Sequence, residues 1–224
     1  MPDPTPPPPR ELHSIVVLGA MNPRLHHPQW YREIGAIDET ELQSALSETM
    51  NVTPTFTQFQ FGNPPIVISS QADFWQIQLT EEKLWPRMVE MASIVFAKLD
   101  ETPVSAFALN TQLHRDTSAT DVKALIARVL VNLNFGLPTG KSEGADMTVN
   151  AIEDDYTVAM SVQASLLSER AVFVFYQSQY PTSAAARRHF ELGSLLKARV
   201  DGYLAKSRTA IDNAVSAINT LAAK

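Results

Sequence analysis

The chain of 224 residues carries 18 Lys and Arg against 24 Asp and Glu, is 45% hydrophobic and contains no cysteine. This size fits one ordinary globular domain or two small, tightly joined ones. Without cysteine, the chain cannot form a disulfide, a thiolate zinc site, a cysteine-ligated iron–sulfur cluster or a cysteine nucleophile. The formal net charge of −6 opposes nucleic-acid phosphates, so such binding would need a local basic patch.

The first ten residues contain six prolines and lack the apolar segment of a secretory signal. Proline-rich sequence of this kind favours an extended, solvated backbone, so we expect a disordered arm over residues 1–12. No uninterrupted apolar run approaches the ~18 residues of a membrane span. We therefore expect a cytoplasmic protein with no membrane contact.

The first half of the chain opens with an apolar segment rich in β-branched residues, residues 14–20, which predicts a buried strand. Trp30, Ile34 and Ile37 then fall at helical spacing. The further elements expected here are a short helix at 39–47, strands at 56–61, 66–70 and 74–79, and a helix capped by Thr80 that runs to about Leu99.

The second half of the chain repeats this order of elements. The elements expected there are a strand at 104–109, a helix capped by Ser118, a Gly/Pro-rich linker at 134–144, strands at 147–152, 157–167 and 171–176, and a long helix from about Ser183. The chain therefore reads as β-α-β-β-β-α, written twice.

A sequence match supports an internal duplication. Residues 20–26 and 108–114 align at an offset of 88 with four identities in seven. The predicted fold class is α+β, with two β-α-β-β-β-α repeats that join into one antiparallel sheet, helices on one side and a long C-terminal helix. The corresponding division is an arm at 1–12, repeats at 13–103 and 104–200, and a projecting helix end at 201–224.

Two resemblances follow from this layout. The doubled element order is similar to the saddle of TATA-binding proteins, whose open concave sheet face engages DNA. The segments at 74–79, 104–110 and 170–176, with a helix that contains Trp85 and a long closing helix, resemble a sporadically distributed family of uncharacterised bacterial proteins. Both resemblances imply an α+β fold and assign no functional residues.

Motifs for catalysis or cofactor binding are weak. Residues 136–142 look like the end of a phosphate-binding loop, but only three residues separate the glycines, and no helix can start directly after Lys141-Ser142. His26 and His114 occupy matching repeat positions, yet a pseudo-dyad would send them to opposite ends of the sheet. Residues 153–155 are acidic and read as a solvated hairpin turn. We expect no catalytic residue, metal or cofactor.

Aromatic residues on the predicted strands are the stronger signal. Alternate strand residues point to opposite faces, so some of these rings should lie on the face that the helices leave open. The candidate partner-binding residues on the strands are Phe59, Phe61, Trp75, Phe173 and Phe175. The alternative is that these rings form the core and ordinary cross-strand pairs.

The C-terminal helix is expected to be too long for its domain. From residue 183 to 222 it would extend roughly 60 Å, about twice what a two-layer domain of this size covers. Leu204, Ile211 and Ile218 lie at heptad spacing, which favours a helical interface with a partner or a second copy. Packing within the chain and contact with a membrane or polyanion are the alternatives. A chain truncated after Leu196 should then keep a folded core.

Together these features predict a non-enzymatic cytoplasmic binding or assembly protein that uses an open sheet face and its last helix. The first alternative is a small-molecule-binding or enzymatic domain of helix-grip type, with a pocket between the long helix and the sheet. The second alternative is a nucleic-acid-binding saddle. It is disfavoured because residues 183–224 carry a net charge of +4, which leaves −10 on residues 1–182.

Overall fold

The computed structural model describes residues 10–48, 50–132, 146–153, 155–182 and 192–223. The strands are β1 (Glu11–Gly19), β2 (Asn51–Val52), β3 (Phe56–Phe61), β4 (Ile66–Gln71), β5 (Phe74–Leu79), β6 (Val104–Asp116), β7 (Asp146–Ile152), β8 (Thr157–Ala164) and β9 (Ala171–Pro181). The helices are α1 (Pro28–Glu33), α2 (Glu39–Ser47), α3 (Trp85–Lys98), α4 (Val122–Asn132) and α5 (Leu192–Ala222), with 3₁₀ turns at Pro23–Leu25 and Glu82–Leu84.

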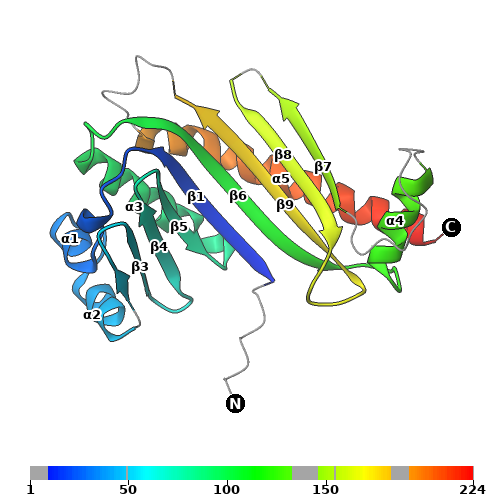
Figure 1. Ribbon diagram of the computed structural model, residues 1–224, viewed down its shortest axis with the longest axis horizontal. Coiled ribbons are helices and arrows are strands. Elements are labelled where there is room, and N and C mark those ends of the chain that lie inside the picture. The colour runs from blue at the N-terminus through cyan, green and yellow to red at the C-terminus, as the bar shows by residue number, and fades with distance from the viewer. Residues whose placement is uncertain (1–9, 49, 133–145, 154, 183–191, 224) are drawn as a thin grey trace.

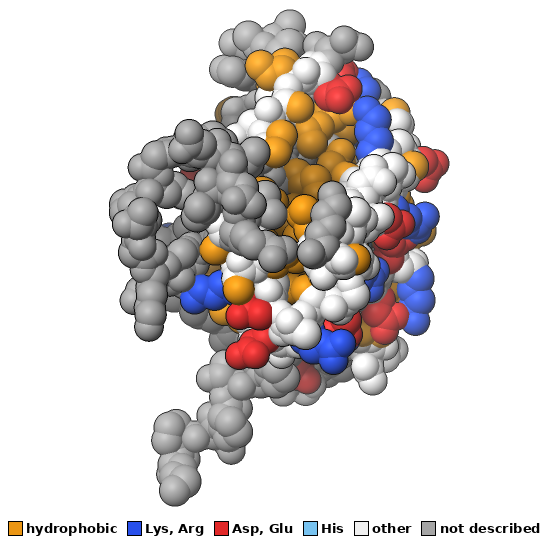
Figure 2. All heavy atoms as spheres, turned by 90° about the vertical axis from the view of Figure 1, so that its right-hand side faces the viewer, with side chains coloured by type: hydrophobic (Ala, Val, Ile, Leu, Met, Phe, Trp, Pro, Cys, Tyr) orange, Lys and Arg blue, Asp and Glu red, His pale blue; other side chains and the backbone are white. Residues whose placement is uncertain are grey.

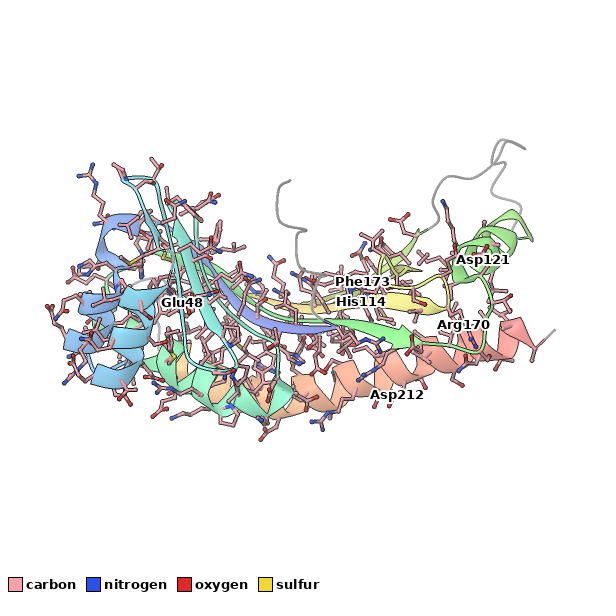
Figure 3. All side chains as sticks on the ribbon, turned by 90° about the horizontal axis from the view of Figure 1, so that it is seen from below. Glu48, His114, Asp121, Arg170, Phe173 and Asp212 are labelled. Carbon is pink, nitrogen blue, oxygen red and sulfur yellow. The ribbon has the colours of Figure 1, made fainter. Side chains whose placement is uncertain are left out.

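The nine strands form one antiparallel sheet in the order β2-β3-β4-β5-β1-β6-β9-β8-β7 (Figure 1). β1 and β6 pair at the centre, so both halves of the chain share a continuous sheet. α3 and α5 lie along one face of it, α1 and α2 pack against β3 on that face, and α4 stands at the far end of the sheet beside the last turns of α5 (Figure 3). The predicted α+β class, the antiparallel sheet and the long C-terminal helix are confirmed.

The internal repeat is not confirmed. Outward from β1 and from β6 the sheet continues through three strands in matching order, yet the sequence match has no structural counterpart. Residues 20–26 follow β1 and include the 3₁₀ turn Pro23–Leu25, whereas residues 108–114 lie inside β6. The aligned residues therefore occupy different backbone conformations, and the match at an offset of 88 gives no support for a duplication.

α5 runs along β6 and β9 on the helix-covered face, and its last turns pack beside α4, so it does not project from the domain. Its 31 residues extend about 46 Å. The two long strands β6 and β9, of 13 and 11 residues, extend roughly 43 and 36 Å beneath it. Ile211 and Ile218 are 2% and 3% exposed and pack in the core under β8 and β9. The predicted projecting end at 201–224 is therefore wrong, because β6 and β9 beneath the helix are longer than the sequence predicted and α4 packs beside its last turns.

Two helix starts also differ from the sequence prediction. The helix expected to be capped by Thr80 begins at Trp85, after the 3₁₀ turn Glu82–Leu84. The helix expected to be capped by Ser118 begins at Val122, because Ser118 donates its backbone and hydroxyl hydrogen bonds to Asn219 of α5. Ser118 is therefore engaged in a tertiary contact and does not cap the helix. The linker at 134–144, the arm at 1–9 and residues 183–191 lie outside the described residues.

Among the described helices, none combines the length and hydropathy needed to cross a bilayer.

Candidate functional site

The sheet has a helix-covered face and an open face, and strand register assigns each residue to one of them. Phe59 and Phe61 are 1% exposed and Trp75 is fully buried, all on the covered face. The prediction that these three residues form an open binding face is wrong. Strand alternation fixed that Phe59 and Phe61 share a face, but α1 and α2, which cover that face, come from earlier in the chain.

Phe173 and Phe175 lie on the open face. Their neighbours on β9, Val172, Val174 and Tyr176, are buried on the covered face. The ring of Phe173 packs 4.9 Å from the ring of His114 on β6. Figure 3 shows Phe173 and His114 on the side of the sheet opposite α5. Both phenylalanines are half-buried, so each combines a packed base with an accessible ring edge.

The open face combines uncharged amide and hydroxyl side chains with apolar ones, among them Val16, Phe74 and Phe175. Its amide residues are Asn51, Gln58, Gln60, Gln71, Gln76, Gln78, Asn110, Gln112, Asn150, Gln163, Gln177 and Gln179. In the described strands, the formally charged residues on this face are Asp116 and Asp146, each at a strand end. The pattern is visible in the sequence as glutamine at every second position of β3, β5 and β9. The binding residues predicted from the sequence on these strands were the aromatic rings and did not include the amides.

A hydrogen-bond ladder orders the centre of this face. Gln177 of β9 donates from Nε2 to Asn110 Oδ1 at 2.9 Å, and Asn110 of β6 donates from Nδ2 to Ser14 Oγ at 3.0 Å. Asn110 is 7% exposed and Ser14 is 3% exposed. Because each amide both donates and accepts, the ladder fixes these side chains without any ion pair.

His114 is the titratable group near this centre. Its Nδ1 lies 2.7 Å from Ser165 Oγ. Burial, and secondarily the positive charge of Arg10, lowers the pKa of His114. The imidazole is therefore neutral at pH 7, and the middle of the open face carries no net charge.

The buried residue His26 belongs to the core on the covered face. Trp75 Nε1 donates to Tyr31 Oη at 2.7 Å, and Tyr31 Oη lies 3.0 Å from His26 Nδ1. Burial, with a smaller contribution from His27, lowers the pKa of His26 to about 4. His26 and His114 thus lie on opposite faces and do not form a common site. Asp155 pairs with Arg199, and Asp154 lies outside the described residues.

Most of the interface predicted on the last helix is buried by packing within the chain. Ile211 and Ile218 are core residues, while Leu204 is half-buried. Leu204 lines a groove of about 550 Å³ between α3 and α5, together with Trp85 and Val200. The groove lies in the helix layer. Between α5 and the sheet, Tyr203 packs directly and donates to Thr111 Oγ1 at 2.8 Å, at the place where the helix-grip alternative needs a pocket.

No known protein-family model matches the chain, and no curated protein matches it. The resemblances to the TATA-binding saddle and to the family of uncharacterised bacterial proteins therefore stay expectations.

The two phenylalanine pairs should respond differently to truncation. Phe59→Ala or Phe61→Ala removes a fully buried ring and should cost ~3–5 kcal/mol each. Phe173→Ala or Phe175→Ala should cost about 1 kcal/mol or less, because these rings are half-buried and α5 lies on the other face. Urea unfolding of the four variants measures both. Equal losses at all four positions would contradict the assignment of faces.

Proposed function

We propose that this protein is a non-enzymatic binding protein whose open sheet face receives the uncharged, polar surface of another protein. The observation that carries the proposal is the face of amide side chains with formal charges only at its ends within the described strands. Amides can donate to and accept from a partner backbone or side chain. A face without charge also avoids the large cost of desolvating ions when a partner covers it.

The extent of the face favours a macromolecular partner. At the usual strand spacing the sheet is roughly 40 Å across, far wider than a small ligand. Phe173 and Phe175 add apolar contact area beside the amides, and aromatic residues are enriched in the centres of protein interfaces. In the described strands this face carries no Lys or Arg to pair with phosphates, which argues against the nucleic-acid saddle.

The test places charge at the centre of the open face. The variant Gln76→Lys with Gln179→Lys should lose a binding partner that the wild type captures from its native host, because each ammonium must be desolvated in the complex. The matched control is Thr209→Lys with Asn213→Lys, which adds the same charge to exposed positions of α5. With the purified partner, Kd should rise roughly tenfold or more for the first variant alone. Equal retention by both variants would contradict the proposal.

Self-association through β7 is a second candidate. β7 ends the sheet order, and Val149 and Ile152 on it are 64% and 89% exposed. Figure 2 shows hydrophobic side chains gathered at this end of the molecule, with charged ones along one flank. An exposed edge strand with apolar side chains favours pairing with another strand.

Light scattering tests this candidate. The wild type should form a dimer, and Val149→Lys with Ile152→Lys should return it to a monomer. The control is Leu166→Lys, because Leu166 is 94% exposed but lies beyond the end of β8. A wild-type chain that stays monomeric at high concentration would exclude self-association.

A further inference from the structure

Three side chains of metal-ligand type meet on the helix-covered side of the sheet, away from the open face. Glu11 and His13 are two residues apart on β1 and so point to the same face. Glu82 reaches them from the 3₁₀ turn before α3, and one donor atom from each residue lies within 4.8 Å of the others. The contact joins segments about seventy residues apart in sequence, which is why sequence spacing gave no signal for it.

The Nε2 atom of His13 lies 2.5 Å from Glu11 Oε1, so a metal ion bound at this nitrogen must replace that hydrogen bond. His13 is 1% exposed, and its ring packs 5.6 Å from the ring of Trp85. Its Nδ1 lies 3.1 Å from Thr111 Oγ1, and Thr111 in turn accepts a hydrogen bond from Tyr203. A histidine that binds metal through one ring nitrogen needs an acceptor for the proton on the other, and Thr111 provides it.

We propose that Glu11, His13 and Glu82 bind one divalent transition-metal ion of the zinc type. One imidazole nitrogen and two carboxylate oxygens suit Zn²⁺, whereas Mg²⁺ and Ca²⁺ prefer oxygen ligands throughout. This site is independent of the proposed partner-binding face.

The adjoining groove gives the ion access to a further ligand. Glu82 and Trp85 both line the groove of about 550 Å³ between α3 and α5. Three protein donors leave the fourth position of a tetrahedral zinc site for that ligand.

Arg208 of α5 competes with the metal. Its Nε donates to Glu82 Oε2 at 3.2 Å, and a second guanidinium nitrogen pairs with Glu82 Oε1. The two carboxylates and the guanidinium of Arg208 together carry one formal negative charge. A metal ion must displace Arg208 from Glu82, so removal of Arg208 should strengthen metal binding. A cluster that serves only as an ion-pair network gives no such result.

The experiment measures Zn²⁺ binding to the full-length, chelator-treated protein by calorimetry, with Co²⁺ absorption as a second readout of the ligand field. The wild type should bind one ion per chain. Glu82→Gln should weaken binding roughly tenfold or more. Arg208→Gln should tighten it roughly tenfold, because a nearby positive charge is removed. Glu90→Gln removes one negative charge, as Glu82→Gln does, but at a position in the same groove outside the cluster. This control variant should leave Zn²⁺ binding unchanged.

Circular dichroism of each variant separates loss of the site from loss of the fold, and Glu82 is accessible enough that Glu82→Gln should fold normally. Absence of Zn²⁺ binding by the folded wild type would overturn the proposal. So would equal binding by the wild type and Glu82→Gln, or weaker binding by Arg208→Gln.

Discussion

A chain that ends at Leu196 is expected to lose its cooperative fold. The truncation removes Val200 and Tyr203 from the first core cluster and Ile211 and Ile218 from the second. Burial of one such side chain contributes about 1.5–3 kcal/mol. Four of them therefore approach the whole stability of an ordinary domain, about 5–15 kcal/mol. The sequence predicts the opposite result, because its pattern places residues 201–224 on a projecting helix end.

Circular dichroism and urea unfolding measure the effect. The control is a chain that ends at Ala222, which keeps every buried residue of α5. The single variants Ile211→Ala and Ile218→Ala should each lose ~2–5 kcal/mol, in line with the cavity that each leaves. A sharp unfolding transition in the Leu196 truncation, within about 1 kcal/mol of the full chain, would show that the second half of α5 does not hold the sheet.

The second large effect is a loss of stability in mild acid. The pKa of His26 is about 4 in the folded chain and 6.5 in its ordinary environment. Between these pH values the unfolded chain binds a proton that the folded chain excludes, so stability rises with pH. Stability should be retained above pH 6.5 and should fall by about 3 kcal/mol as the pH approaches 4.

Urea unfolding of the wild type and His26→Asn from pH 7 to pH 4 isolates this contribution. Asparagine keeps an acceptor for the Tyr31 hydroxyl but does not titrate, so the variant should lose most of the pH dependence assigned to His26. His13 and His114 also have lowered pKa values and act in the same direction in both proteins. Parallel pH curves for the two proteins would show that His26 does not set the acid sensitivity.

The candidate binding face was only partly predictable. In β3, β5 and β9, phenylalanine and glutamine recur at every second position, which tells which residues share a face. It does not state which of the two sets is covered. In β3 the rings Phe59 and Phe61 are buried and the glutamines are on the open face, whereas in β9 Phe173 and Phe175 lie on the open face with the glutamines.

The sequence alone determined the local structure, because the signals for it lie within a few residues. Period-two and helical hydrophobic patterns placed most strands and helices, and the segment at 39–47 forms α2 with the Asp38–Glu41 capping box. Only the tertiary structure decided that the far half of α5 packs against β8, β9 and α4 and that Glu82 meets Glu11 and His13. These contacts join residues far apart in the chain, and their positions depend on strand length and strand register, which no local pattern contains.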